Sequence, residues 1–254
     1  MRLLQRTRGA LSSMCYRFGW DTRCRNVQPA RLLRSRLNGA MSGTGPALLD
    51  VGSGSPGLSA FLRDVRVVGL DTRAPTEGKA QGLFVVSDAT ALPFHAEAVP
   101  AVTCIDVLEH MIPEDRIRVI KEMVRVAASL VLIAFPDGAR ARSCDLVFHE
   151  ACQRRSRPIP EWLKEHLTHE YPDAETTAEQ IRAAAEAAGR HATITLTYCE
   201  PLRICRLVRA AASRSNWLYA MTNLAFGVLL PIIPVPDAVR GYRTILLAEL
   251  FPKT

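Results

Sequence analysis

Four aspartates and one glycine-rich loop are the residues whose types and spacing suit a binding site. The loop is D-V-G-S-G-S-P-G, residues 50–57, and its glycines have the G-x-G-x-x-G spacing. Glycine at these positions lets a backbone turn tightly and approach a nucleotide-like ligand. Asp50, Asp71, Asp88 and Asp106 each stand at the end of an apolar run. The pattern predicts a cofactor site with a strongly acidic lining.

The elements that must position these aspartates form an alternating series of apolar runs and helical patterns. We expect strands at residues 47–51, 65–70, 83–87, 101–107, 130–135, 191–197 and 242–250, and helices that begin at 58 or cover 113–127, 160–171 and 176–188. Strand–helix alternation with continuously apolar strands predicts a parallel sheet covered on both faces. The expected fold is therefore a Rossmann-like, doubly wound α/β fold with a mostly parallel seven-stranded sheet. In such a sheet the four aspartates meet in one crevice, at the carboxyl ends of the strands.

The glycine spacing alone does not separate this site from that of an NAD-dependent oxidoreductase, in which Asp71 could also hold a ribose. However, Asp50 at the mouth of the loop would repel a pyrophosphate. No Lys or Arg occurs in residues 48–62 to balance one. A single aspartate here could be a helix cap or turn residue, but four at successive strand ends favour a cationic ligand without phosphate.

The motifs D-V-G-S-G, V-V-G-L-D, D-A-T-A-L-P-F and D-V-L-E-H resemble those of the class I S-adenosylmethionine-dependent methyltransferases, in particular the group called methyltransferase type 11. The resemblance covers residues 47–136 and implies S-adenosylmethionine as the cofactor. The implied cofactor-binding residues are Asp50, Gly52, Gly54, Asp71, Asp88, Ala89, Asp106 and Val107.

The resemblance also implies which part of the cofactor each of these residues would contact. Asp50 and the backbone of Gly52 and Gly54 would hold its methionine end, and Asp71 would accept both ribose hydroxyls. The loop departs from the usual pattern at Pro56, so the last glycine is a less secure contact than the first two.

The next two motifs would complete the cofactor site. Asp88 would accept the adenine amino group and the Ala89 N–H would bind the ring, while Asp106 and Val107 would line the floor near the methyl group. Methyl transfer to an O–H or N–H acceptor releases a proton, so a nearby base assists. His110 is the expected base because it follows the fourth strand on the cofactor side. The weaker candidates are His149, His166 and His169.

We expect no metal ion. The alternative is a divalent cation held by Asp106, Glu109 and His110. The letters D-V-L-E-H occur widely without metal, so they do not by themselves require one.

The acceptor is expected to be a small molecule, a lipid-linked intermediate or a glycan. Residues 134–138, A-F-P-D-G, lack the N-P-P-Y-like pattern of nucleic-acid methyltransferases, so no sequence-specific nucleic-acid partner is expected. An alternative function also remains open: the protein could bind the cofactor without catalysis, as a partner in a membrane-associated assembly.

The sequence divides into a basic N-terminal helical arm, residues 1–44, and a methyltransferase domain, residues 45–254. Within the domain, 140–175 and 203–240 are expected to cover the pocket. The first 45 residues hold nine Arg and one acid, which suits an anionic partner, a solvated helix face or a mitochondrial transit peptide. Seven cysteines without a C-x-x-C pair indicate a reducing compartment, and we expect a cytoplasmic protein.

Residues 215–236 carry no charge and follow an Arg-rich stretch. Asn, Thr and Gly dilute the run and three prolines break its end, so we reject a transmembrane helix. Two hypotheses remain. The segment either packs as a lid over the acceptor site or lies on an anionic membrane surface as a peripheral contact.

Overall fold

The computed structural model describes residues 19–37, 45–54, 57–74, 83–229 and 241–253. Its centre is a seven-stranded sheet with the order β3-β2-β1-β4-β5-β7-β6. The strands are β1 (Leu48–Val51), β2 (Val67–Asp71), β3 (Leu83–Val86), β4 (Val99–Ile105), β5 (Ala127–Pro136), β6 (Arg190–Cys199) and β7 (Arg243–Pro252). All seven expected strands are confirmed.

The first five strands in the sequence are parallel to one another, whereas β7 pairs antiparallel with both β5 and β6. β1 and β4 lie side by side in the middle, although β2 and β3 come between them in the sequence. The chain therefore leaves β1 toward one edge and returns to its other side, and this reversal is the switch point at which doubly wound folds bind ligands.

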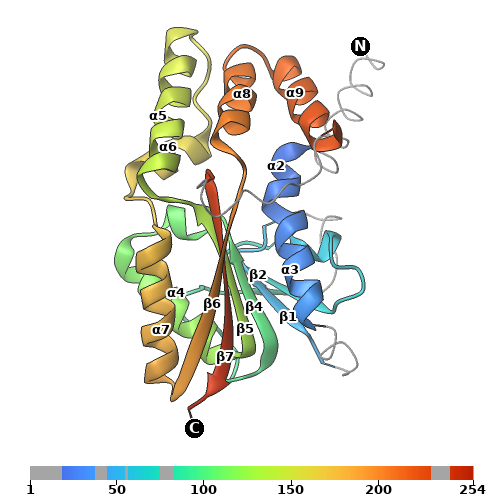
Figure 1. The fold of residues 1–254 in the computed structure, drawn as a ribbon, viewed down its shortest axis with the longest axis vertical. Coiled ribbons are helices and arrows are strands. Elements are labelled where there is room, and N and C mark those ends of the chain that lie inside the picture. The colour runs from blue at the N-terminus through green and yellow to red at the C-terminus, as the bar shows by residue number, and fades with distance from the viewer. Residues whose placement is uncertain (1–18, 38–44, 55–56, 75–82, 230–240, 254) are drawn as a thin grey trace.

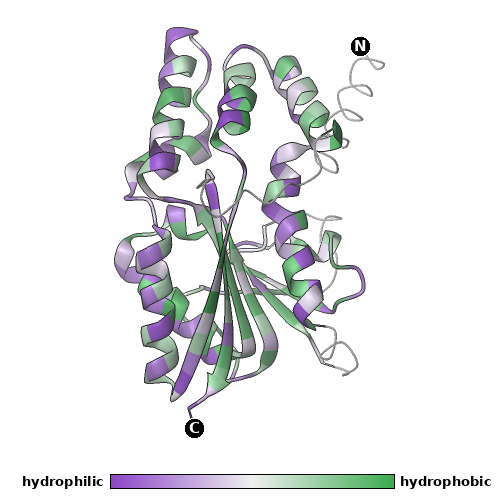
Figure 2. Cartoon of the chain, in the orientation of Figure 1, coloured by the Kyte–Doolittle hydropathy of each residue, from purple (hydrophilic) through white to green (hydrophobic). Residues whose placement is uncertain are grey.

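Two hydrophobic cores cover the two faces of the sheet. On one face α4 (Pro113–Val126) and α7 (Ala174–Ala187) pack through residues such as Ile120 and Ile181. On the other face α3 (Gln28–Leu37) packs through Leu33. Figure 1 shows these helices on opposite sides, and Figure 2 shows the hydrophobic strands between them.

A second group of helices stands beyond the carboxyl ends of the strands (Figure 1). It comprises α5 (Gly138–Arg154), α6 (Glu161–Thr168), α8 (Leu202–Ala212), α9 (Asn216–Leu229), α2 (Trp20–Thr22) and the adjoining π-helix η1 (Arg23–Val27). Among the described residues, no helix combines the length and apolarity needed to cross a membrane. Expected segment 203–240 is described only as far as 229, and the N-terminal arm only over 19–37.

Several helices differ from the sequence-based expectation. The helix expected to begin at 58 is a 3-10 turn, η2 (Leu58–Ala60), because only 15 residues join β1 to β2 and the glycine loop uses the first of them. α7 begins two residues early, because Asp173 caps it by accepting the Thr176 N–H at 2.9 Å. α5, α8 and α9 were not expected as helices.

Candidate active site

The glycine loop follows β1 directly and turns in the left-handed region at Gly52 (φ 67°) and Gly54 (φ 56°). A Cβ on Gly52 would lie 2.2 Å from Cγ2 of Val107, which follows the neighbouring strand β4. The Gly52 N–H donates to the Leu70 carbonyl of β2 at 2.8 Å. The loop is thus fixed between its two neighbouring strands, and only glycine fits at position 52.

Asp50 holds the loop from inside the protein. Its buried carboxylate accepts the Leu58 N–H at 2.9 Å and the Thr103 hydroxyl at 2.9 Å. Burial raises the pKa of Asp50 to about 6, although the hydrogen bonds from Leu58 and Thr103 oppose the rise. Its expected contact with the methionine end of the cofactor stays a prediction.

Asp71 is the last residue of β2 and Asp88 follows β3, and both side chains remain accessible. Asp71 accepts the Gly54 N–H at 3.1 Å, so its carboxylate already lies against the glycine loop. Asp88 accepts the Thr90 N–H and hydroxyl, both at 2.8 Å, and these bonds lower its pKa. Asp88 therefore stabilises the turn that follows β3. Its predicted contact with the adenine amino group, and that of the buried Ala89 with the adenine ring, stay predictions.

A cavity of about 250 Å³ lies between the glycine loop and the N-terminal helices. Its lining includes three of the predicted residues, Asp50, Gly52 and Gly54. Asp21 and Arg25, from α2 and η1, close it on the other side. Asp71 and Asp88 lie outside this lining.

Asp106 directly follows β4 and has a left-handed conformation (φ 54°), which is uncommon for a residue other than glycine. Arg243 donates to both of its carboxylate oxygens, at 2.9 and 2.7 Å, and Arg25 pairs with it at 3.0 Å. Burial would raise the pKa of Asp106, but Arg243 and then Arg25 outweigh burial and lower it. The carboxylate is therefore charged, and it is bound to arginines that sequence reasoning missed.

His110 lies in the 3-10 turn η3 (Leu108–His110), just beyond the carboxyl end of β4, and its side chain is half-buried. Its Nδ1 is 2.9 Å from Oε2 of Glu165, and its ring meets the edge of the His166 ring at a centroid distance of 4.7 Å. Burial and then His166 lower its pKa. A neutral imidazole can accept a proton, so this environment suits the predicted base.

A larger cavity, about 580 Å³, opens beside Asp106 under the second group of helices. His110 and His166 line it, whereas His149 and His169 do not. Its aromatic walls are Trp20, Phe148, Trp162, Tyr219 and Tyr242, and its arginines are Arg25, Arg157, Arg209 and Arg243. These four arginines belong to no local sequence motif, so the sequence alone does not identify them as cavity residues.

The comparisons with known proteins agree with this geometry. Residues 49–135 match a family model described as a methyltransferase domain. A S-adenosylmethionine-dependent methyltransferase from Thermotoga maritima superposes with a TM-score of 0.54 at 11% identity, covering 98% of this chain and 96% of that one. A protein named as a methyltransferase of an antibiotic biosynthesis pathway in Anabaena variabilis gives a TM-score of 0.52 at 13% identity, covering 89% and 98%. Among curated proteins no sequence matches the chain.

The strand order and the glycine loop define a Rossmann-like methyltransferase fold. In addition, residues 49–135 are similar to a methyltransferase domain, as the four motifs predicted. The expected fold is confirmed, and both comparisons agree with the expected methyltransferase family and with its cofactor, S-adenosylmethionine.

Proposed function

We propose that the protein transfers a methyl group from S-adenosylmethionine to an oxygen or nitrogen atom of a small-molecule or lipid-linked acceptor. One observation carries the proposal: the two cavities adjoin, and Asp21 and Arg25 line both of them. Asp106 lines the larger cavity, and its neighbour Ile105 lines the smaller one. A cofactor on the glycine loop and an acceptor beside Asp106 would therefore meet across a short boundary.

The larger cavity has the chemistry of a small-molecule site. Aromatic walls with a few convergent charged groups are typical of pockets that bury most of a ligand. Methyl transfer requires the acceptor atom to lie in line with the sulfur–methyl bond, and enclosure supports this alignment. His110, on the cavity wall, would take the acceptor proton as the methyl group moves to the acceptor atom.

The test is comparison of cell extracts incubated with the protein and S-adenosylmethionine carrying a deuterated methyl group. We expect one or more small metabolites to gain the label, and S-adenosylhomocysteine to accumulate in proportion. Cofactor binding without any labelled product would favour the catalytically silent partner. Tight NAD binding in place of S-adenosylmethionine binding would contradict the assignment altogether.

We also propose that α8 and α9 touch an anionic membrane surface, because α9 exposes four large apolar side chains. Its buried residues are Asn223 and Gly227, both bound to α2 and η1: Asn223 accepts the Asp21 N–H at 3.0 Å, and Arg23 donates to the Gly227 carbonyl. Tyr219 and Phe226 pack against Trp20 and its neighbours, but four other large apolar side chains of α9 are exposed. The exposed ones are Trp217 (65%), Met221 (41%), Val228 (60%) and Leu229 (74%).

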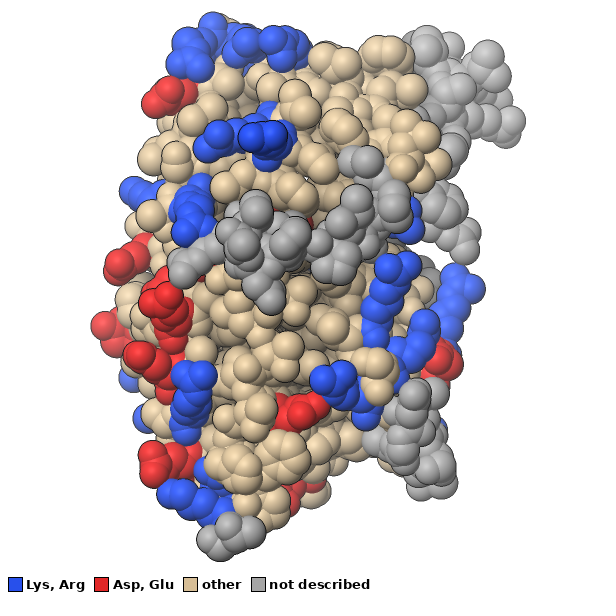
Figure 3. All heavy atoms as spheres, in the orientation of Figure 1, with Lys and Arg blue, Asp and Glu red and all other residues tan. Residues whose placement is uncertain are grey.

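Basic residues border this apolar face, which supports an anionic rather than a neutral surface. Arg203, Arg206 and Arg214 are exposed on or beside α8, as is the apolar Leu207. Figure 3 shows an uncharged surface over α9 with basic side chains over the neighbouring helices. An apolar face with flanking arginines is the pattern of helices that lie in the headgroup region. Since Asn216 and Tyr219 of α9 also line the larger cavity, a lipid-linked acceptor could enter from this side.

Flotation with vesicles tests this contact. We expect binding to vesicles that contain phosphatidylserine, weakened by high salt, and none to phosphatidylcholine alone. Trp217→Ser combined with Leu229→Ser should abolish flotation. Leu83→Ser with Val86→Ser, which alters two equally exposed apolar residues on edge strand β3, is the matched control and should float. If the unaltered protein never floats, the membrane contact is excluded and the lid hypothesis remains.

A further inference from the structure

Glu109 is a buried carboxyl group without a hydrogen-bond partner among the described residues. Its side chain is fully buried, and both of its oxygens are unsatisfied. A buried polar group left unpaired costs free energy, so native structures nearly always supply a partner. Glu109 therefore needs either a proton or a cation that enters from the cavity.

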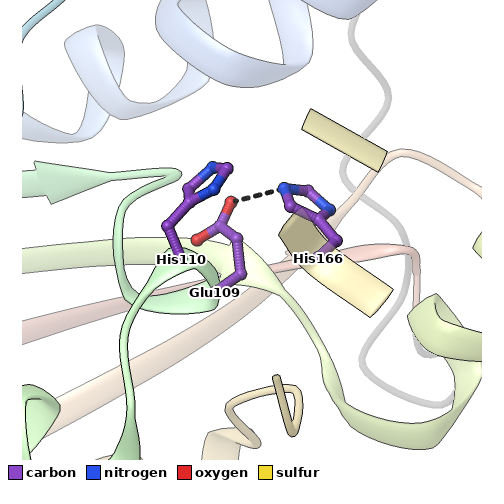
Figure 4. A group of neighbouring side chains, drawn as sticks. All are labelled: Glu109, His110 and His166. Atoms are coloured by element: carbon purple, nitrogen blue, oxygen red, sulfur yellow. Dashed lines mark ion pairs between the residues drawn. The ribbon is translucent and has the colours of Figure 1, made fainter. Parts of the chain in front are cut away.

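Two imidazoles flank this carboxyl group. His166 Nε2 lies 3.8 Å from Glu109 Oε1, and one potential ligand atom from each of Glu109, His110 and His166 falls within 4.8 Å of the other two. Figure 4 shows the carboxylate between the two rings. We propose that Glu109, His110 and His166 bind a divalent transition-metal ion of the zinc type at the wall of the larger cavity.

A second layer of contacts holds His166 for this purpose. Its Nδ1 lies 3.3 Å from Oδ2 of Asp145, which leaves Nε2 directed toward Glu109. Asp145 is fixed in turn by Arg209 and by the hydroxyls of Tyr171 and Tyr242. A carboxylate bound to the far nitrogen of a ligand histidine is the usual support of a metal site, because it sets the tautomer and the ring orientation.

The donor set indicates the kind of ion. Two histidines and one carboxylate are the ligands of catalytic zinc sites, which keep a fourth position open. All three residues line the larger cavity, so that position would face it. The sequence favoured no metal, and its alternative set used Asp106. In the structure Asp106 is occupied by Arg243 and Arg25, and His166 of α6 takes its place.

The open position suits an oxygen donor such as an acceptor hydroxyl. This consequence, unlike the site itself, depends on the proposed function. A bound cation would favour loss of the hydroxyl proton, and because His110 would then be a ligand of the cation, this proton would pass to water in place of His110. The acceptor oxygen would then bond to the methyl carbon, while the carbon–sulfur bond breaks and its electron pair stays on sulfur. The products would be the methyl ether and S-adenosylhomocysteine.

The test is metal binding by the full-length protein without cofactor or acceptor. After treatment with a chelator and dialysis, we expect one Zn²⁺ per chain by calorimetry and a rise in the unfolding temperature on adding Zn²⁺. Co²⁺ in place of Zn²⁺ should give visible absorption bands. The measurement is independent of methyl transfer, so its failure and the failure of the proposed function are distinguishable.

Variants separate this site from adventitious binding. Glu109→Gln, which keeps the shape of the side chain, and His166→Ala should each weaken Zn²⁺ binding at least tenfold. Asp145→Asn should weaken it by 10- to 100-fold, as is usual for second-layer partners. His169→Ala, at the end of the same helix, is the control and should bind like the unaltered protein. Absence of stoichiometric Zn²⁺, or unchanged binding by Glu109→Gln, would overturn the proposal.

Discussion

Arg243 binds both carboxylate oxygens of Asp106, although 137 positions separate the two residues in the sequence. Arg243 begins β7 and Asp106 directly follows β4, and β5 lies between these two strands in the sheet. Arg243 also donates to Glu200 at 2.7 Å, so one guanidinium group joins two buried acids. The pair holds the floor of the predicted methyl-transfer site in one position, and it keeps Asp106 from acting as a proton acceptor.

Replacing Asp71 by Ala should weaken S-adenosylmethionine binding by about 1–3 kcal/mol, the usual loss when hydrogen bonds to a charged group are removed. The variant would lack the carboxylate that is predicted to hold the ribose, and the Gly54 N–H would lose its acceptor. Calorimetry on the purified protein measures the change. Asp64→Ala is the control, because this exposed aspartate pairs with Arg34 instead. Unchanged affinity of the Asp71 variant would remove it from the ribose site.

Replacing Gly52 by Ala should disrupt cofactor binding and lower stability, because the new Cβ would overlap Val107 and adopt a strained φ. Gly189→Ala separates the two effects. Gly189 has a similar φ of 68° but open space around it, so that variant should lose only about 1 kcal/mol. Urea unfolding and cofactor calorimetry check both variants. Equal losses at the two positions would show that contact with Val107 is unimportant.

The stability of the protein should fall as the pH rises through 6, in part because of Asp50. The folded state raises its pKa from 3.8 to about 6, so folding favours the protonated form. This stabilisation is fully present below about pH 4 and is lost as the pH rises through 6. The difference between the two pKa values corresponds to roughly 3 kcal/mol.

The substitution Asp50→Asn isolates this effect, because the amide does not titrate. Relative to the unaltered protein, the variant should gain stability by roughly 3 kcal/mol between pH 4 and pH 7, whatever constant offset its altered hydrogen bonds add. Urea unfolding across this range measures it. Parallel curves for the two proteins would contradict the expectation.

Mild oxidation should join α5 to α8 through Cys144 and Cys205, whose sulfur atoms lie 3.6 Å apart without a bond. The hydrogen bond with Cys205 lowers the pKa of Cys144 to about 7, which favours the reactive thiolate. Arg209 also lowers this pKa, and burial opposes the change. With oxidised glutathione as electron acceptor, we expect loss of two free thiols per chain. Mass mapping should identify the linked peptides, and Cys144→Ser should prevent the link. Oxidation that spares both residues would count against it.

The strands and the four aspartates were predictable because both depend on local sequence. Most of the strands are aliphatic runs, whereas β6 alternates threonine with apolar residues, and each aspartate stands at or just after the end of an apolar run. By contrast, α5 was missed because its buried residues include Cys144, Asp145 and Cys152 in place of a regular aliphatic stripe. A helix that buries polar groups is specified by its tertiary partners, which periodicity does not reveal.

The partners of the site residues were not predictable for a related reason. The sequence gives no sign that Arg25 and Arg243 converge on Asp106, since their positions depend on strand order and on where the N-terminal helices pack. His166 was a weaker candidate, yet it is buried between Asp145 and Glu109. Ion pairs between distant segments follow from topology, and one sequence does not determine them.

The position of β7 has a consequence for protein synthesis. It is the seventh strand to leave the ribosome but the sixth in the sheet, where it separates β5 from β6. Until it emerges, β5 exposes an unpaired edge of buried aliphatic residues, and β6 has no neighbour on which to fold. Such open edges attract other chains. A nascent chain stalled before residue 243 would therefore depend on chaperones, and it would also lack the arginine that neutralises Asp106.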